Sequence, residues 1–192
     1  MTAPEIELAV EDPRWDAEAG VASVLRAAAA AALEAAGVDG AGRSISILLT
    51  ADGPMAELNG RFRGKPAPTN VLSWPAEDLA AEAEGAAPAA PSPPAAPDQE
   101  PESLGDLALA RETLAREAAE AGKPLDAHLF HLAAHGTLHL LGYDHEREGD
   151  AARMEALESR ICLAAGHPDP YLAEIEAEAP RPPAAAASEK GP

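Results

Sequence analysis

The sequence predicts a protein that combines four strands with about five helices, and two kinds of hydrophobic pattern support this expectation. Strands are indicated by alternating or continuous short apolar runs at residues 6–10, 44–50, 70–74 and 104–109. Helices are indicated by apolar residues that recur every three or four positions at residues 16–36, 52–58, 111–121, 125–141 and 149–165. Glycine and proline separate most of these segments, which favours turns between them.

The first elements have clear boundaries. Residues 6–10 alternate Ile, Leu and Val with Glu and Ala, and a proline follows the strand. The helix at 16–36 is expected to end at Gly37, a residue type that commonly terminates helices. The strand at 44–50 is apolar enough to lie in the centre of a sheet, and Asp52 is expected to cap the short helix that follows.

The later elements are bounded in the same way. Pro75 closes the strand at 70–74, and the strand at 104–109 resumes after a long interval. The helix at 111–121 ends at a glycine, and Pro124 opens the helix at 125–141. The last helix carries three apolar residues at helical spacing, namely Met154, Leu157 and Ile161.

Two segments differ in composition from the rest of the chain. Residues 79–101 are an insertion rich in Ala, Pro and Glu, which buries too little apolar surface to offset the entropy of ordering it. We therefore expect this insertion to be disordered. Residues 176–192 share its composition and are expected to form a disordered tail, and residues 1–175 are expected to form a single domain.

The composition also bears on the compartment. Cys162 is the only cysteine, so an internal disulfide is excluded and a reducing environment is favoured. The first residues have neither the basic start nor the apolar run of a signal peptide, and no window approaches the roughly 18 apolar residues that a membrane span needs. We expect a soluble cytoplasmic protein with no membrane partner.

The net charge is −19, but the charge is distributed unevenly. Residues 76–102 hold seven acids and no base, whereas no acid occurs between Asn59 and Ala76. Arg61, Arg63 and Lys65 alternate within that acid-free interval. Such a basic strip on an acidic protein could bind phosphate groups, and the alternative is an ordinary solvated loop.

The helix at 125–141 is apolar over most of its circumference, so we expect it to be buried. Its one polar line consists of four histidines at helical spacing, His128, His131, His135 and His139. Buried imidazole nitrogens need partners, and a metal ion could supply them. For His128 and His131 the alternative is a place beside a solvated cleft.

The segment 135–145, HGTLHLLGYDH, predicts a metal site. His135 and His139 lie one helical turn apart, which is the usual helical half of a zinc site. Gly142 stops the helix, and the next two residues bring His145 back towards the same face. Three imidazoles leave a fourth position on Zn²⁺ open to water, which indicates a hydrolytic centre with one zinc per chain. The same ligands also suit nickel and copper.

The residue after the first histidine separates two classes of zinc hydrolase. The protease motif H-E-x-x-H places a general base there, whereas this chain has Gly136. The absence of a carboxylate within the helical motif favours phosphodiester cleavage over peptide cleavage. Gly136 is also expected to leave room for a backbone or a substrate.

Three stretches resemble the YbeY family of bacterial metal-dependent endoribonucleases, which act in ribosomal RNA maturation. The first is the histidine motif 135–145, the second is LNGRFRGKPAPTNVLSWP at 58–75, and the third is LGDL at 104–107. The resemblance covers roughly residues 5–172. It departs from the family at Asn70, where Asp is usual, and at Trp74, where Phe is usual. The loss of a charge at Asn70 puts any electrostatic function of that position in doubt.

The resemblance implies an α+β fold, a small mixed four-stranded sheet covered by about five helices, with the metal helix buried. It implies that the metal ligands are His135, His139 and His145, and that Arg63 is catalytic or binds phosphate. Arg61 and Lys65 are weaker candidates for substrate binding, and Asp144 could orient an imidazole or simply form a turn.

The implied function is zinc-dependent cleavage of single-stranded RNA in small-subunit (16S) rRNA maturation and ribosome quality control. The implied partners are the rRNA precursor, the small ribosomal subunit and its assembly factors. Two alternatives remain open at this point, a metallopeptidase-like hydrolase and a non-catalytic ribosome-assembly factor whose zinc is structural. The attacking group, metal-activated water or the RNA 2′-hydroxyl, is also open.

Overall fold

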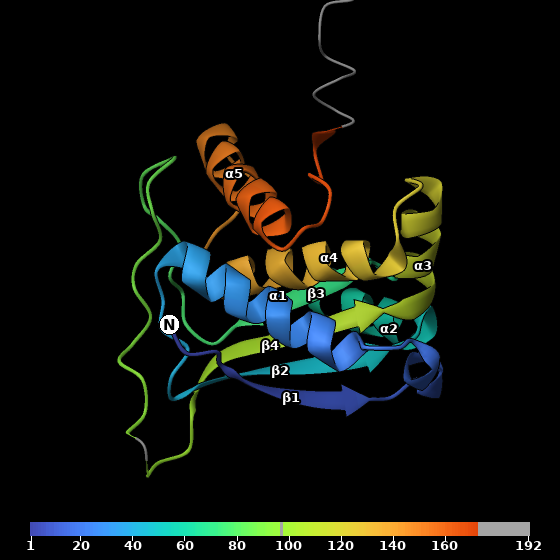
Figure 1. Cartoon of the computed structure of the whole chain (residues 1–192), viewed down its shortest axis with the longest axis horizontal. Coiled ribbons are helices and arrows are strands. Elements are labelled where there is room, and N and C mark those ends of the chain that lie inside the picture. Colours follow the sequence, from blue (N-terminus) through green and yellow to red (C-terminus); the bar gives the residue numbers. More distant parts are fainter. Residues whose placement is uncertain (97, 173–192) are drawn as a thin grey trace, which may run out of the picture.

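The computed structural model describes residues 1–96 and 98–172, in which helices lie on both faces of one mixed sheet (Figure 1). The strand order is β1 (Glu5–Val10), β2 (Arg43–Thr50), β4 (Glu102–Ala110) and β3 (Val71–Pro75). β2 is parallel to both β1 and β4, whereas β3 is an antiparallel edge strand. The α-helices in the described residues are α1 (Val21–Ala36), α2 (Asp52–Arg63), α3 (Arg111–Glu120), α4 (Leu125–Leu140) and α5 (Glu148–Ala164). The predicted α+β class and four-stranded sheet are confirmed.

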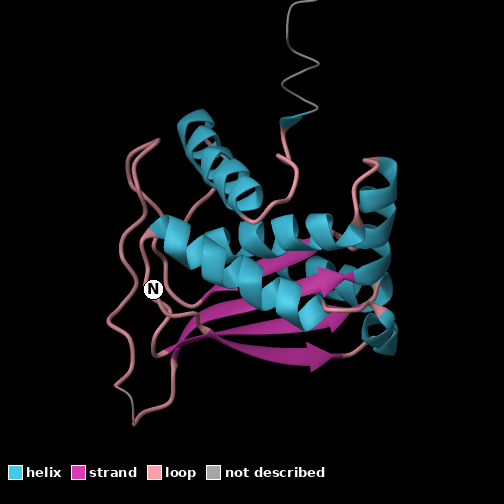
Figure 2. Cartoon of the chain, in the orientation of Figure 1, coloured by secondary structure: helices cyan, strands magenta, loops and turns pink. Residues whose placement is uncertain are grey.

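Alternating side chains along the strands separate two apolar clusters. Ile47 on β2 and Leu107 on β4 belong to the larger cluster, which includes α1, α4 and α5. Ala108 on β4 and Leu72 on β3 face the other way and meet Met55 of α2. α1 and α4 cover one face of the sheet, and α5 lies across the outside of that helical layer (Figure 2). α2 is on the opposite face.

α4 is buried as predicted, and its burial depends on a close approach to the sheet. Of its 16 residues, ten are buried, from Ala127 to Leu140. A Cβ atom at Gly136 would lie 3.0 Å from a Leu107 side-chain carbon and 3.3 Å from one of Val71. Of the two options expected for Gly136, the structure shows the close approach of a backbone, because this glycine lets the helix approach β3 and β4.

Two local predictions also differ from the structure. The helix predicted from residue 16 begins at Val21, because Gly20 has a left-handed backbone (φ 80°) and a short 3-10 helix occupies Pro13–Ala17. The predicted cap of α2 by Asp52 is wrong, because the N-cap position is Ala51. The Asp52 carboxylate instead accepts the backbone N–H of Thr113 in the first turn of α3 (3.0 Å).

The described part of the insertion (residues 79–96 and 98–101) contains neither helix nor strand, but it is hydrogen-bonded to the folded body. The Gly85 N–H donates to Asp150 (2.8 Å), the Gly149 N–H donates to Glu84 (2.8 Å), and Arg43 donates to the Ser92 carbonyl (2.7 Å). Its disorder stays a prediction, and the predicted tail at 176–192 lies outside the described residues. Over the described ranges, no helix has both the length and the apolarity needed to cross a membrane.

Candidate metal centre

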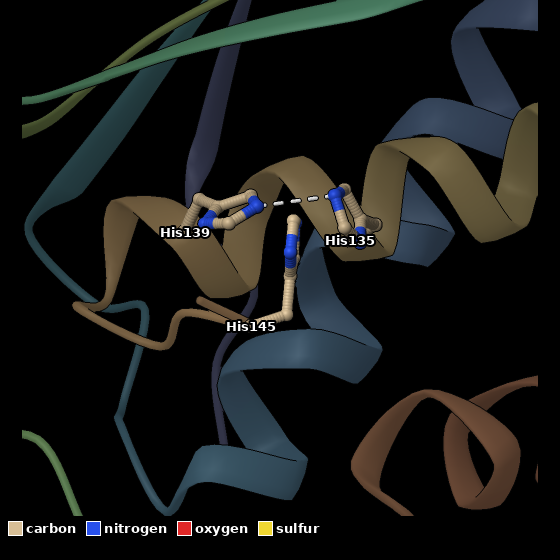
Figure 3. Close-up of side chains that lie close together, drawn as sticks. All are labelled: His135, His139 and His145. Carbon is tan, nitrogen blue, oxygen red and sulfur yellow. Dashed lines mark hydrogen bonds between the residues drawn. The ribbon is translucent and has the colours of Figure 1, made fainter. Parts of the chain in front are cut away.

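His135 and His139 leave α4 in the same direction, one turn apart, and their rings point toward one another (Figure 3). The Nε2 atoms of the two rings are 3.1 Å apart. Both side chains are half-buried, because the rest of the helix lies in the core. The predicted helical pair is therefore formed with its nitrogens converging.

The loop after α4 returns the third histidine to this pair. Gly142 has φ 84°, and the Tyr143 N–H donates to the Leu138 carbonyl (3.1 Å), which ends the helix as predicted. A Cβ atom at Gly142 would lie 2.6 Å from the Leu79 backbone, so glycine is also required by space. The His145 ring points back between the other two rings (Figure 3), with centroids 5.4 Å from His135 and 5.1 Å from His139.

The outer nitrogens of the two helical rings are held by oxygen acceptors. His135 Nδ1 lies 2.9 Å from a carboxylate oxygen of Glu158, and His139 Nδ1 lies 2.9 Å from the Tyr143 carbonyl. A carbonyl can only accept, so His139 carries its proton on Nδ1, and an ionised Glu158 sets the same tautomer in His135. Each Nε2 then presents a lone pair towards the other ring. Two lone pairs that face each other at this distance call for a cation between them.

Glu158 is an ionised carboxylate in the interior, with a side chain only 1% exposed. Burial opposes its ionisation, but hydrogen bonds with His131, His135 and Tyr171 together lower the pKa of Glu158 below its usual range. Burial, with smaller contributions from His135 and His145, lowers the pKa of His139 from 6.5 to about 4. Neutral imidazole is the form that binds metals, so these shifts favour a metal site.

The donor set fits a divalent transition ion. One nitrogen from each of His135, His139 and His145 lies within 4.8 Å of the others. Two nitrogens bound to one tetrahedral zinc, each at about 2.0–2.1 Å, stand about 3.3 Å apart, close to the observed separation of the helical pair. The three histidines could therefore hold a metal ion with small adjustments of the exposed His145.

The other two histidines of the polar line have carboxylate partners. His131 Nε2 lies 2.6 Å from Glu158, and His128 Nε2 lies 3.0 Å from Glu117 of α3. Burial lowers the pKa of His128, and the nearby Glu117 opposes this shift. Glu117 also accepts a hydrogen bond from the Asn70 amide (3.0 Å), which an Asp at that position could not donate. These contacts account for His128 and His131 without a metal.

Arg63 and one histidine of the cluster, His139, line the same cleft. The cleft has a volume of about 470 Å³, and its lining includes Arg63, Ser73, His139 and Tyr143. Arg63 is the last residue of α2, and its side chain is exposed. The structure therefore brings the predicted arginine and the predicted metal site, 72 residues apart in the sequence from Arg63 to His135, to one hollow.

The weaker candidates lie around this cleft. Arg61 and Lys65 are exposed and are absent from its lining, and the Arg61 guanidinium lies 6.0 Å from the centre of the Phe62 ring. Asp144 lines the cleft, but its carboxylate accepts the backbone N–H of His145 (2.7 Å). That contact is to the backbone of the turn and not to an imidazole ring.

Two features of the site were not predicted from the sequence. Glu158 is an acid within the apolar stripe of α5, four residues after Met154 and three before Ile161, and this position was the available signal. The segment that leads into the insertion also lines the cleft, through residues 76–80, of which residues 79–80 belong to the insertion. Composition alone gave no sign of that second feature.

Together these features define an α+β protein with a three-histidine cluster that could bind a metal ion, in which one of the histidines lines a cleft with an arginine. Residues 9–166 match the family model described as Endoribonuclease YbeY. The chain belongs to this family, which confirms the resemblance noted from its motifs.

Curated relatives carry the same description. A protein of Dinoroseobacter shibae named Endoribonuclease YbeY is 52% identical over 86% of this chain and 90% of its own. Proteins with that name from Jannaschia sp. and Ruegeria pomeroyi are 48% and 49% identical, over 87% and 88% of this chain and 99% of theirs. A solution structure of a Thermotoga maritima protein is 18% identical, with a TM-score of 0.47 over 84% of this chain and 91% of that one.

Proposed function

We propose that this protein is a zinc-dependent endoribonuclease that cleaves single-stranded RNA. One observation carries the proposal beyond the family name: Arg63 and His139 line the same cleft, so a phosphate could contact the arginine beside the histidine cluster. His135, His139 and His145 would hold the ion, and Arg63 would be the catalytic cation.

Each group has a separate task in this proposal. When bound, zinc supplies Lewis-acid chemistry and lowers the pKa of water to about 7. Glu158 and the Tyr143 carbonyl keep the Nε2 lone pairs of His135 and His139 directed into the site. Arg63 offers planar N–H donors to the phosphate oxygens, where negative charge grows in the transition state.

We further propose a cytoplasmic site of action on the small-subunit (16S) rRNA precursor, together with the small ribosomal subunit and its assembly factors, in rRNA maturation and ribosome quality control. The family resemblance supports this proposal, and the names of the relatives support the RNA substrate. The acid-free basic strip at residues 59–76 gives an otherwise acidic chain a place to meet RNA.

The test measures metal content and cleavage of a labelled single-stranded RNA before and after chelation and reloading. Arg63→Ala is expected to keep the metal and lose about 10²–10³-fold in kcat, the usual effect of removing a charge-stabilising donor. His139→Ala is expected to lose both metal and activity. Arg26→Ala, an exposed arginine of α1, is the matched control and retains both.

Undiminished cleavage by metal-loaded Arg63→Ala or His139→Ala would overturn the proposal. Cleavage of an unfolded protein instead of RNA would favour the metallopeptidase alternative. Full metal content with no cleavage of either substrate would favour a structural zinc in an assembly factor. The ends of the RNA products identify the attacking group, since a cyclic phosphate marks attack by the 2′-hydroxyl.

A further inference from the structure

Next to the cleft, on the α2 face of the sheet, lies a second hollow of about 660 Å³. Its lining is mostly apolar and includes Leu48, Leu58, Phe62 and Trp74. α2 covers only part of this face, so the hollow is open to solvent. No metal ligand or arginine of the cleft takes part in its lining.

Phe62 and Trp74, together called the aromatic ledge, are the unusual feature of this hollow. Phe62 is 59% exposed, and it is the only aromatic residue among the exposed large hydrophobic residues of the described chain. Its ring meets Trp74 edge to face, with centroids 5.2 Å apart and planes at 65°. The Trp74 ring thereby supports the Phe62 ring from one side and leaves aromatic surface open.

The ledge adjoins the cleft through two elements. Phe62 immediately precedes Arg63 at the end of α2, and Trp74 lies between Ser73 and Pro75 on β3. Arg63, Ser73 and Pro75 line the cleft, whereas Phe62 and Trp74 line the hollow on the other face. β3 is an edge strand, so a flexible polymer could pass around it from one hollow to the other.

Charge sorts the parts of such a polymer. Arg61 lies over the Phe62 ring and attracts phosphates to the α2 side of the ledge. Asp106 pairs with Trp74 across β3 and β4, lines the hollow, and repels phosphates from its floor. A backbone held along the basic residues would therefore direct a base, rather than a phosphate, towards the rings. Aromatic rings stack on bases of any sequence.

We propose that the aromatic ledge stacks a base of the single-stranded RNA next to the phosphate in the cleft. The identity of the ligand rests on the proposed function, but the ledge is a separate binding element. It would bind only unpaired nucleotides, because a base within a duplex cannot expose its face. The ledge would thus contribute to the choice of single strands.

The test measures binding of a labelled single-stranded RNA to the metal-free protein, so that cleavage does not interfere. Phe62→Ala is expected to raise Kd about 5-fold to 140-fold, the range that corresponds to one stacked base. Phe62→Tyr is expected to restore binding. Leu163→Ala on α5, where Leu163 is 57% exposed, is the matched control for removal of a surface apolar side chain.

Abasic substitutions within the RNA sharpen the test. At the position that stacks on the ledge, loss of the base is expected to lower the RNA affinity of the wild-type protein. The RNA affinity of Phe62→Ala should not change there, so the effects of the two alterations are not additive. Binding is also expected to quench the half-exposed Trp74, whereas the second tryptophan, Trp15, is 2% exposed. Duplex RNA is expected to produce no quenching.

The proposal that the ledge stacks a base would be contradicted if Phe62→Ala and Leu163→Ala bound RNA equally well. Additive effects at every abasic position would contradict it too. The outcome is separable from the proposed function. If the protein binds RNA through Phe62 but never cleaves it, base stacking on the ledge is supported and the nuclease function is contradicted. If Phe62→Ala cleaves RNA with an unchanged KM, the nuclease function is supported and base stacking on the ledge is contradicted.

Discussion

Two regions that meet at the cleft are built in opposite ways: the histidine cluster on α4, called the first wall, and the basic strip at the end of α2, called the second wall. His139 and Arg63 are the members of these two regions that line the cleft itself. On the α4 side, His135 and His139 are half-buried, and each outer nitrogen is held by an oxygen acceptor. On the α2 side, Arg61, Arg63 and Lys65 are exposed. The loop that carries Lys65 is fastened by its backbone, through the Asn59 amide and the Ala67 carbonyl (2.8 Å), while the charged ends extend into solvent.

This difference matches two physical requirements. A metal site needs lone pairs that converge before the ion arrives, because each ligand that must be ordered on binding reduces the affinity. A site for a flexible polyanion gains from long side chains that adapt to it, and its electrostatic attraction acts at a distance. The metal affinity of the first wall should therefore fall sharply when one contact is altered. The RNA affinity of the second wall should decrease gradually as exposed cations are removed.

Among the changes in metal binding, stability and salt dependence, Glu158→Gln is expected to produce the largest, through loss of the ordered imidazoles of the first wall. An amide has one acceptor oxygen, so the glutamine side chain cannot accept hydrogen bonds from both His131 and His135 as the carboxylate does. Zinc affinity, measured by competition with a coloured chelator, is expected to fall about 10-fold to 100-fold.

The control for this substitution is Glu117→Gln. Glu117 also pairs with a histidine of α4, but that residue is His128, outside the cluster. It is expected to keep the wild-type zinc affinity. Zinc affinity that is unchanged in Glu158→Gln, in a variant whose circular dichroism is native, would contradict the orienting function of Glu158.

The same difference determined what could be predicted from the sequence. The helical pair and its glycine stop are local, since the spacing of His135, His139 and Gly142 fixes their geometry once the helix forms. Glu158 lies 23 residues beyond His135, and their contact depends on how α5 packs across α4. The cap predicted at Asp52 failed for a similar reason, because a sequence does not show that the start of α3 lies close to its carboxylate.

The basic strip was recognised from composition, but the direction of each side chain was not. Arg61, Arg63 and Lys65 are alternate residues that span the end of a helix and the start of a loop, so spacing does not fix their directions. The structure places only Arg63 in the cleft. The relation of Phe62 to Trp74 depends on the packing of α2 on β3, which no local pattern encodes.

A pH titration of the metal-free protein is expected to produce an intermediate effect. The pKa of His139 is about 4 in the folded protein and 6.5 at its ordinary value, so the unfolded chain binds the proton more readily. The contribution of the buried neutral ring to the free energy of unfolding is fully present above the ordinary pKa of 6.5 and decreases as the pH falls towards about 4.

The urea midpoint of the metal-free protein is therefore expected to fall between pH 7 and pH 4.5, and to fall less in His139→Gln, which removes the titrating ring. The pKa of His128 is lowered too, so the urea midpoint of His139→Gln should still decrease in part as the pH falls. Identical slopes for the wild-type and His139→Gln proteins would show that burial of His139 does not affect acid stability.

The smallest effects are expected on the second wall. Arg61→Ala and Lys65→Ala each remove one exposed cation, and each is expected to weaken binding of single-stranded RNA only a few-fold near physiological salt. Their signature is the salt dependence: the slope of log Kd against log salt concentration should decrease by about 0.7 for each phosphate contact that is lost. The same titration of Glu158→Gln should keep the wild-type slope, because that carboxylate lies behind the histidines and meets no phosphate. If Arg61→Ala and Lys65→Ala also kept the wild-type slope, the basic strip would be an ordinary solvated surface, and only Arg63 would remain as a contact to the RNA backbone.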